Sequence, residues 1–175
     1  MIRDAKREDL PGILEIYAPY VTESTVSFEY EVPSLKAFEE RFERITAFYP
    51  WLVCEIDGKV VGYAYLSRAF ERKAYRFMAD LSVYVDLGER GKGYGRALVE
   101  KIEEIAKKQR LCAIYAIVTE ENGASKAFHE KMGYERMAIF PQSGYKFGKW
   151  LSVLWYRKKL FDGNPEELLS YREVE

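Results

Sequence analysis

Apolar residues recur at helical spacing in two segments near the start of the chain. Asp9 is a candidate cap and Pro11 fits a first helical turn; the apolar positions that follow are Ile13, Leu14 and Tyr17. Pro33 and Ser34 open the second segment, whose apolar positions are Leu35, Phe38, Phe42 and Ile45. We therefore expect two helices before the first strand.

Runs rich in β-branched and aromatic residues come next. Residues 51–56 and 59–67 flank Asp57-Gly58, a strong signal for a two-residue hairpin turn. The charged segment 68–76 reads as a loop. Beyond it, further strands are predicted at 77–85, 111–118, 134–140 and 150–160.

Helical periodicity returns in the second half of the chain. The glycine-rich residues 88–95 lead into a long amphipathic helix, whose apolar face carries Leu98, Ile102, Ile105 and Ala106. Residues 122–132 predict a short helix that Gly133 closes. No linker or repeat divides the chain. The pattern therefore predicts one α/β domain with a mixed sheet at residues 1–160, followed by a polar tail at 161–175.

Composition narrows the class of protein. The chain has 175 residues, 48% of them hydrophobic, which is enough for one compact domain with a substantial core. Its 27 basic and 28 acidic residues give a net charge of -1, so nothing general favours nucleic acid or a membrane surface as a partner. Residues 1–6 lack an apolar signal segment and no run could span a bilayer, so we expect a cytoplasmic protein.

The cysteines and the histidine give little support for a disulfide or a metal site. Cys54 and Cys112 are far apart, each inside an apolar run, and form neither a disulfide framework nor a metal motif. His129 is the only histidine, which excludes any site that needs two. We therefore expect no metal.

The strongest chemical signal is a glycine-rich turn between a predicted strand and a predicted helix: Arg90-Gly91-Lys92-Gly93-Tyr94-Gly95. Glycines allow a sharp turn that brings several N–H groups close to a ligand. The helix that follows adds unpaired N–H donors and the positive end of its dipole. Together with the charges of Arg90, Lys92 and Arg96, these groups predict an anion site, and phosphate is the usual anion.

Two common phosphate loops do not fit this turn. A dinucleotide GxGxxG motif would need glycine at Arg96, and a P-loop would need serine or threonine where Gly93 stands. A plain glycine-rich connection between strand and helix stays an alternative for the hexapeptide by itself.

The pattern Arg-x-x-Gly-x-Gly resembles the pyrophosphate-binding motif of the GCN5-related N-acetyltransferases. A later pattern, Asn122-x-x-Ser125-x-x-x-His129-x-x-x-Gly133-Tyr134, stands where that family places its next motif. The resemblance implies a single domain with a mixed, mostly antiparallel sheet flanked by helices. It also implies acetyl-CoA as co-substrate, with its pyrophosphate on the turn.

The same resemblance implies further cofactor contacts. The strand before the turn would supply backbone groups to the pantetheine amides, here at Val83, Tyr84 and Val85. Asn122 would hydrogen-bond the cofactor near its reactive end, with Ser125 beside it. A simple helix cap is the alternative role for Asn122.

Several other segments closely resemble phosphinothricin and methionine-sulfoximine N-acetyltransferases, namely residues 25–31, 49–53, 74–75, 82–85 and 144–150. In that subfamily a glutamate before the turn is the proposed base, and Asp80 stands there. Aspartate is one methylene shorter, which favours a relaying water; a cap or salt bridge is the alternative role. His129 stands where many relatives carry a tyrosine that protonates the departing thiolate, although a structural role is open.

Substrate residues follow from the resemblance in the same way. Glu31 matches an acidic position that contacts the amine, while Phe28, Tyr75 and Arg76 are candidates for the pocket wall. Arg72, in the same charged loop as Arg76, offers another cation for a carboxylate. The subfamily often has histidine at the position of Phe147 and aspartate at that of Ser152, so this chain departs from it there.

We therefore expect direct acetyl transfer from acetyl-CoA to the amine of a small amino-acid-like molecule. A backbone N–H of the strand would stabilise the oxyanion. Two alternatives stay open. One is an enzyme of the same fold that acetylates a protein N-terminus or a polyamine; the other is a non-catalytic acetyl-CoA-binding module. Relatives are often dimers, so a homodimer is also expected.

Overall fold

One seven-stranded sheet organises the molecule in a computed structural model that describes residues 1–175. Its strand order is β1-β2-β3-β4-β5-β7-β6. All neighbouring strands are antiparallel except β4 and β5. The expected α/β fold with a mixed, mostly antiparallel sheet is thus confirmed. The strands are β1 (Ile2–Asp4), β2 (Trp51–Ile56), β3 (Lys59–Arg68), β4 (Met78–Val85), β5 (Ala113–Thr119), β6 (Glu135–Lys146) and β7 (Lys149–Lys159).

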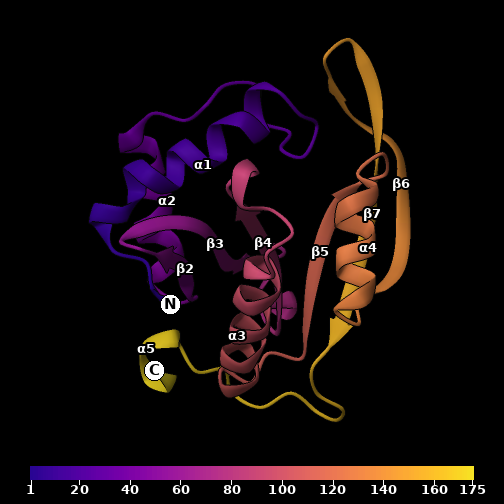
Figure 1. The fold of residues 1–175 in the computed structure, drawn as a ribbon. Coiled ribbons are helices and arrows are strands. Elements are labelled where there is room, and N and C mark those ends of the chain that lie inside the picture. Colours follow the sequence, from indigo (N-terminus) through magenta and orange to yellow (C-terminus); the bar gives the residue numbers. More distant parts are fainter.

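Helices cover both faces of this sheet (Figure 1). Tyr84 of β4 packs edge-on against Tyr17 and Tyr20 of α1, whereas Val85 lies beside the first turn of α3. Because successive side chains of a strand point to opposite faces, α1 and α3 lie on opposite sides of β4. The helices are α1 (Leu10–Thr22), α2 (Leu35–Thr46), α3 (Tyr94–Lys108), α4 (Gly123–Lys131) and α5 (Tyr171–Val174).

Most predicted elements appear within a few residues of their expected ends. Ser34 caps α2 by accepting a hydrogen bond from the Ala37 N–H, and Asp57 and Gly58 turn the β2–β3 hairpin with positive φ. Asp9 differs from its expected role. Its carboxylate accepts from the Arg3 guanidinium and the Lys6 N–H and makes no cap hydrogen bond to α1.

Three features were not predicted. β1 is a short strand that pairs with β2, and β6 continues beyond residue 140 to Lys146. Pro141 is tolerated there because β6 is an edge strand, and the β6–β7 register shifts between Phe140 and Gly144. The resulting β6–β7 hairpin extends beyond the rest of the molecule (Figure 1).

The third unexpected feature is order in the tail at 161–175. The Tyr171 N–H donates to the Phe48 carbonyl over 2.9 Å, and the Tyr171 hydroxyl donates to Asp4 over 2.6 Å. Gln109, at the end of α3, donates from its side-chain amide to the carbonyls of both Phe48 and Leu169. The tail therefore packs back against α2, α3 and β1.

The two strands that flank β4 pair with it over very different lengths. β3 pairs with it along residues 62–68. β5 pairs only through Met78–Asp80 opposite Ala113–Tyr115, in register. Beyond Asp80 the two parallel strands separate (Figure 1). The last five residues of β4 therefore border a gap in the sheet.

Candidate active site

The edge of β4 along this gap carries backbone groups without a strand partner. Asp86 donates its N–H to the Val61 carbonyl of β3. Since the direction of backbone groups alternates along a strand, Val83 and Val85, beyond the last pair with β5, point theirs into the gap. The Val85 carbonyl already accepts from the Tyr20 hydroxyl. The rest form an open ladder edge, suited to the amides of an extended ligand.

Tyr84 is placed differently from its two neighbours. Tyr84 pairs with Tyr63 of β3, and this pairing uses the backbone groups of Tyr84. The Tyr84 ring packs among Tyr17, Tyr20 and Tyr63. Of the three strand residues expected at the cofactor, Val83 and Val85 therefore offer backbone groups to the gap. Tyr84 instead supports the strand from behind.

The glycine-rich turn lies at the end of this gap. Gly91 and Gly93 adopt φ of 80° and 87°, which strongly favours glycine. Gly93 caps α3 without a side-chain hydrogen bond, and the first helical bond runs from Ala97 to the Gly93 carbonyl. The N–H groups of residues 90–96 accordingly have no partner within the chain, as an anion site requires.

The three cationic side chains of the turn differ in whether they have an acidic partner. Arg90 stacks its guanidinium 5.1 Å from the centre of the Tyr20 ring, the same ring that contacts β4. Lys92 pairs with Glu89 at 2.7 Å, and Arg96 pairs with Glu100 at 2.8 Å. Arg90 is thus the one of the three without an acidic partner.

Gly95 forms the close contact between helix and strand. A Cβ atom here would lie 3.5 Å from Cγ2 of Val85 and 3.8 Å from the Phe128 ring of α4. An alanine would fit, but a branched side chain would push against both borders of the gap. Gly95 therefore keeps the N-terminus of α3 close to the end of β4.

Asn122 caps α4 on the other side of the gap. Its side-chain oxygen accepts from the Ser125 N–H over 3.1 Å, so the simple capping role is present. The amide NH₂ group remains free to donate. The Ser125 hydroxyl lies 3.3 Å from Nδ1 of His129.

His129 does not occupy the position of a proton donor. Only 4% of it is exposed, its ring packs against Tyr134 and Tyr156, and Nδ1 lies 2.9 Å from the Ser125 carbonyl. This contact places the proton of neutral imidazole on Nδ1 and leaves Nε2 without one. Burial also lowers the pKa of His129. The structure thus favours the structural role over the expected acid.

Asp80 is the last residue of β4 that pairs with β5. It lies opposite Ser67 of β3 and Tyr115 of β5, at the point where the sheet opens. Its Oδ1 atom is buried without a hydrogen-bond partner, although the residue as a whole is partly exposed. Burial raises the pKa of Asp80 to about 7. A carboxyl group with this pKa can both accept and release a proton near neutral pH.

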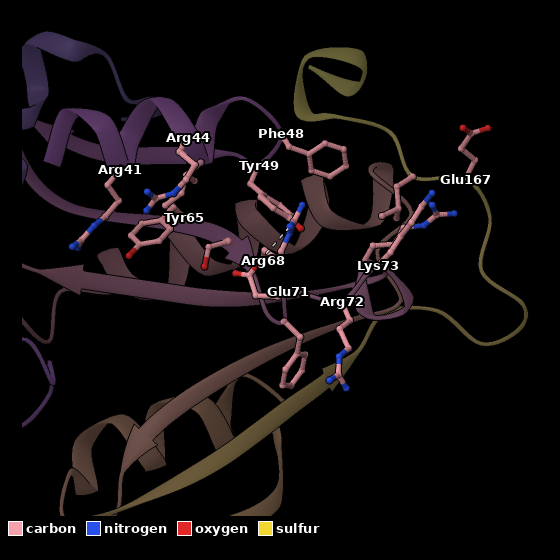
Figure 2. A pocket seen from close by; sticks show the side chains of 15 residues that line it. Arg41, Arg44, Phe48, Tyr49, Tyr65, Arg68, Glu71, Arg72, Lys73 and Glu167 are labelled. Carbon is pink, nitrogen blue, oxygen red and sulfur yellow. Dashed lines mark ion pairs between the residues drawn. The ribbon is translucent and has the colours of Figure 1, made fainter. Parts of the chain in front are cut away.

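An open groove of about 1160 Å³ lies on the face of the sheet to which Ser67 and Asp80 belong (Figure 2). Its wall combines α2, the end of β3, the 68–76 loop and the tail. Glu71 and Glu167 are its only acidic side chains. Its cationic side chains are Arg41, Arg44, Arg68, Arg72, Lys73 and Arg76.

Few of these cations have an acidic partner. Arg41 forms an ion pair with Glu29, and Arg68 lies 3.8 Å from Glu71 in an exposed pair. In Figure 2, Arg44 reaches the groove from α2, whereas Arg72 and Lys73 come from the loop on its other side. The groove is therefore strongly positive and suits an anionic group of a ligand.

The expected substrate residues divide into two groups. Arg72 and Arg76 line the groove. Tyr75 lies outside it and packs its ring at a tilt against Phe70, a lining residue. Phe28 packs over Gly144 of the β6–β7 hairpin, and Glu31 is exposed without an ion pair. The structure thus does not bring Phe28, Glu31 and Tyr75 to the groove wall.

Sequence reasoning missed Glu29 as the acid beside the groove. Glu29 pairs with Arg41 and accepts from the Tyr17 hydroxyl over 2.7 Å. Glu29 and Glu31 are alike in the sequence, and only the path of the loop decides which of them turns inward. No local pattern could have found this difference.

An opened sheet edge beside a row of free N–H groups suits an elongated donor that carries phosphate, as an acyltransferase uses. The chain matches the family model described as acetyltransferase (GNAT) domain over residues 2–155, and it belongs to that family. The resemblance read from the sequence is thereby confirmed.

Curated relatives make the likeness more specific. The chain is 37% identical over 163 residues to the L-methionine sulfoximine/L-methionine sulfone acetyltransferase of Pseudomonas aeruginosa, which covers 91% of this chain and 94% of that protein. It is 33% identical over 165 residues to the phosphinothricin N-acetyltransferase of Alcaligenes faecalis, with 93% and 84% covered. The assignment as an N-acetyltransferase is confirmed.

Solved structures agree on the fold. A phosphinothricin acetyltransferase from Sinorhizobium meliloti, in complex with AcCoA, superposes with a TM-score of 0.92 at 32% identity and covers 98% of both chains. A ribosomal-protein-alanine N-acetyltransferase from Brucella melitensis gives 0.89 at 34% identity, covering 91% of this chain and 99% of that one. The same fold therefore serves two kinds of amine.

No helix has both the length and the apolar character needed to cross a membrane. No cluster of three or more histidine, cysteine, aspartate or glutamate side chains has metal-binding geometry.

Proposed function

We propose that this protein transfers the acetyl group of acetyl-CoA to the amino group of a small amino-acid-like molecule of the phosphinothricin or methionine sulfoximine and sulfone type. The observation that carries the proposal is the position of Asp80. It lies where the sheet opens, opposite Ser67 of the groove wall, with a pKa raised to about 7. The names of the relatives support the substrate class.

The gap fits an elongated, phosphate-bearing donor. Acetyl-CoA supplies a pyrophosphate for the turn, amides for a strand edge and the acetyl thioester that reacts. The free N–H groups of residues 91–96 would bind the pyrophosphate, with Arg90 adding charge. Val83 and Val85 would pair with the amides, and the free NH₂ of Asn122 would donate near the reactive end.

Asp80 would take the proton from the substrate ammonium. A free carboxylate, with a pKa near 4, is a weak proton acceptor. Burial raises the pKa of Asp80 to about 7, which is much closer to the pKa of an ammonium group. Its short side chain favours a relaying water. A backbone N–H of β4 in the gap would donate to the thioester carbonyl oxygen and stabilise its developing charge. The thiolate would take its proton from solvent, because His129 is buried and lacks a proton on Nε2.

The substrate carboxylate would bind at the loop side of the groove. Arg72 and Arg76 line it and have no acidic partner. A guanidinium can hold a carboxylate through two parallel hydrogen bonds, which lysine cannot. A polyamine has no carboxylate, so these cations would repel it.

A thiol-release screen tests the proposal. The purified protein is given acetyl-CoA with phosphinothricin, methionine sulfone, methionine sulfoximine, spermidine or a short peptide. We expect turnover with the amino-acid analogues and little with spermidine. Thiol release with no amine at all would contradict acetyl transfer, and tight acetyl-CoA binding without turnover would indicate a binding module.

An acetyltransferase acting on a protein N-terminus is the second candidate. The openness of the groove and the likeness to the Brucella protein favour it. A peptide that outcompetes every free amino acid in the screen would establish this alternative. The homodimer expected from the resemblance stays a prediction, which light scattering on the purified protein can measure.

A further inference from the structure

Lys146 lies at the end of β6 and has no role in the proposed chemistry. Only 2% of it is exposed. An ammonium group has three N–H donors, and three backbone carbonyl oxygens surround its Nζ atom. The distances are 2.7 Å to Val21, 3.0 Å to Ser24 and 2.6 Å to Ser27. Every donor of this buried cation is therefore used on the last turn of α1 and the segment that follows it.

That segment continues to the groove through a chain of hydrogen bonds. Ser27 Oγ lies 2.6 Å from the Tyr17 hydroxyl and accepts from the Glu29 N–H over 3.1 Å. The Tyr17 hydroxyl donates to the Glu29 carboxylate over 2.7 Å. Glu29 then pairs with Arg41, which lines the groove. Four polar links thus connect Lys146 to the groove wall.

The same segment has two more contacts with the hairpin. The Tyr30 hydroxyl donates to the Tyr145 carbonyl, and the Phe28 ring fills the space above Gly144. A Cβ atom on Gly144 would lie only 2.2 Å from that ring. These contacts hold residues 25–34, which form no helix or strand of their own, against the hairpin.

From these contacts we infer that Lys146 is a positioning residue for the amine site: through Ser27, it holds the Glu29–Arg41 wall of the groove in place. This inference rests on the proposed function, because it assigns the groove to the amine. Lys146 contacts neither substrate. Its loss should leave the glycine-rich turn and the gap largely unchanged, since Lys146 contacts no residue of either.

Lys146→Met tests this role, with Lys149→Met as the matched control. Methionine keeps the length and apolar stem of lysine but has no donor. Lys149 stands across the two-residue turn, is exposed and pairs with Glu121 at 2.7 Å. We expect Lys146→Met to raise the KM for methionine sulfone or phosphinothricin roughly tenfold, the equivalent of about one charged hydrogen bond. The KM for acetyl-CoA should stay within about twofold, and Lys149→Met should change neither value.

A Glu29→Gln background sharpens the test. If Lys146 acts through Glu29, the two substitutions should be non-additive, and Lys146→Met should add little once Glu29 is neutral. A folded Lys146→Met protein with an unchanged KM for the amine would overturn the inference. Equal rises in both KM values would overturn it too, because they would indicate general loosening.

A second variant covers the case in which Lys146→Met does not fold. Ser27→Ala removes the hydroxyl that joins Tyr17 to Glu29, while the three carbonyl contacts of Lys146 remain. The same split between the two KM values is expected, and its absence would also overturn the inference. Failure of the wild-type protein to acetylate any amine would instead contradict the proposed function.

Discussion

The two sides of the proposed active site, for the acetyl donor and for the amine, are built from different parts of the chain. On the donor side, seven consecutive residues, 90–96, present backbone N–H groups at the start of α3. On the amine side, the groove is assembled from side chains of α2, β3, the 68–76 loop and the tail. In the proposed arrangement, the ligand common to the whole family is bound by local backbone geometry, whereas the variable ligand is bound by side chains gathered from distant segments.

Asp80 lies between the two sides, and its loss should have the largest effect. Asp80→Asn keeps the size of the side chain but removes the proton acceptor, so kcat should fall by ~100-fold or more. In the wild-type protein, kcat/KM should rise with pH up to a pKa near 7, as Asp80 loses its proton. Steady-state kinetics across pH 5 to 9 measure both effects. Unchanged turnover would assign Asp80 a structural role and move the search to Glu29 or Glu31.

Gly95→Val should damage the donor side alone. The branched side chain would press on Val85 and Phe128, which border the gap, so acetyl-CoA should bind roughly 10- to 100-fold more weakly. Calorimetry measures the affinity, with circular dichroism to establish folding. Gly95→Ala is the matched control, since a single Cβ meets only ordinary contacts. A folded Gly95→Val protein that binds normally would contradict the assignment of the turn.

Arg76→Ala should damage the amine side alone. The substrate carboxylate would lose a guanidinium, which should raise the KM for methionine sulfone by about tenfold. Esterifying that carboxylate should raise the KM of the wild-type protein in the same way but have little further effect on the variant. Arg72→Ala gives the parallel measurement, and Arg136→Ala, on β6 away from the groove, is the control. Equal use of acid and ester by the wild-type protein would contradict a carboxylate site here.

A further effect is expected on stability rather than on catalysis. Burial raises the pKa of Asp80 from 3.8 to about 7, so the folded state disfavours the carboxylate. Below pH 4, Asp80 is protonated in both the folded and the unfolded state, so its burial costs no stability. As the pH rises to 7, the unfolded state loses this proton more readily than the folded state, and stability is lost. Asp80→Asn should therefore stabilise the protein at pH 8, by up to roughly 4 kcal/mol, and change little at pH 4. Thermal unfolding at the two pH values would show it; equal effects at both would contradict the burial of this charge.

Most secondary structure could be read from local signals. Asp57-Gly58 predicted a hairpin because both residues accept positive φ, and Ser34 predicted a cap because its hydroxyl can reach the Ala37 N–H. β1, the end of β6 and the order of the tail escaped prediction. Each depends on a partner far away in the chain: β1 on β2, residues 144–146 on β7, and Tyr171 on Phe48 and Asp4.

The sequence by itself determined the family, the donor turn and the candidate base. These depend on spacing within short segments, where glycine conformation and the start of a helix fix which groups face a ligand. Tertiary structure alone decided that Glu29 rather than Glu31 turns inward, that His129 is buried and that Lys146 supports the groove. The direction of a side chain in an irregular loop, and the burial of a charge, depend on what packs against it from distant parts of the chain, and no local pattern encodes that.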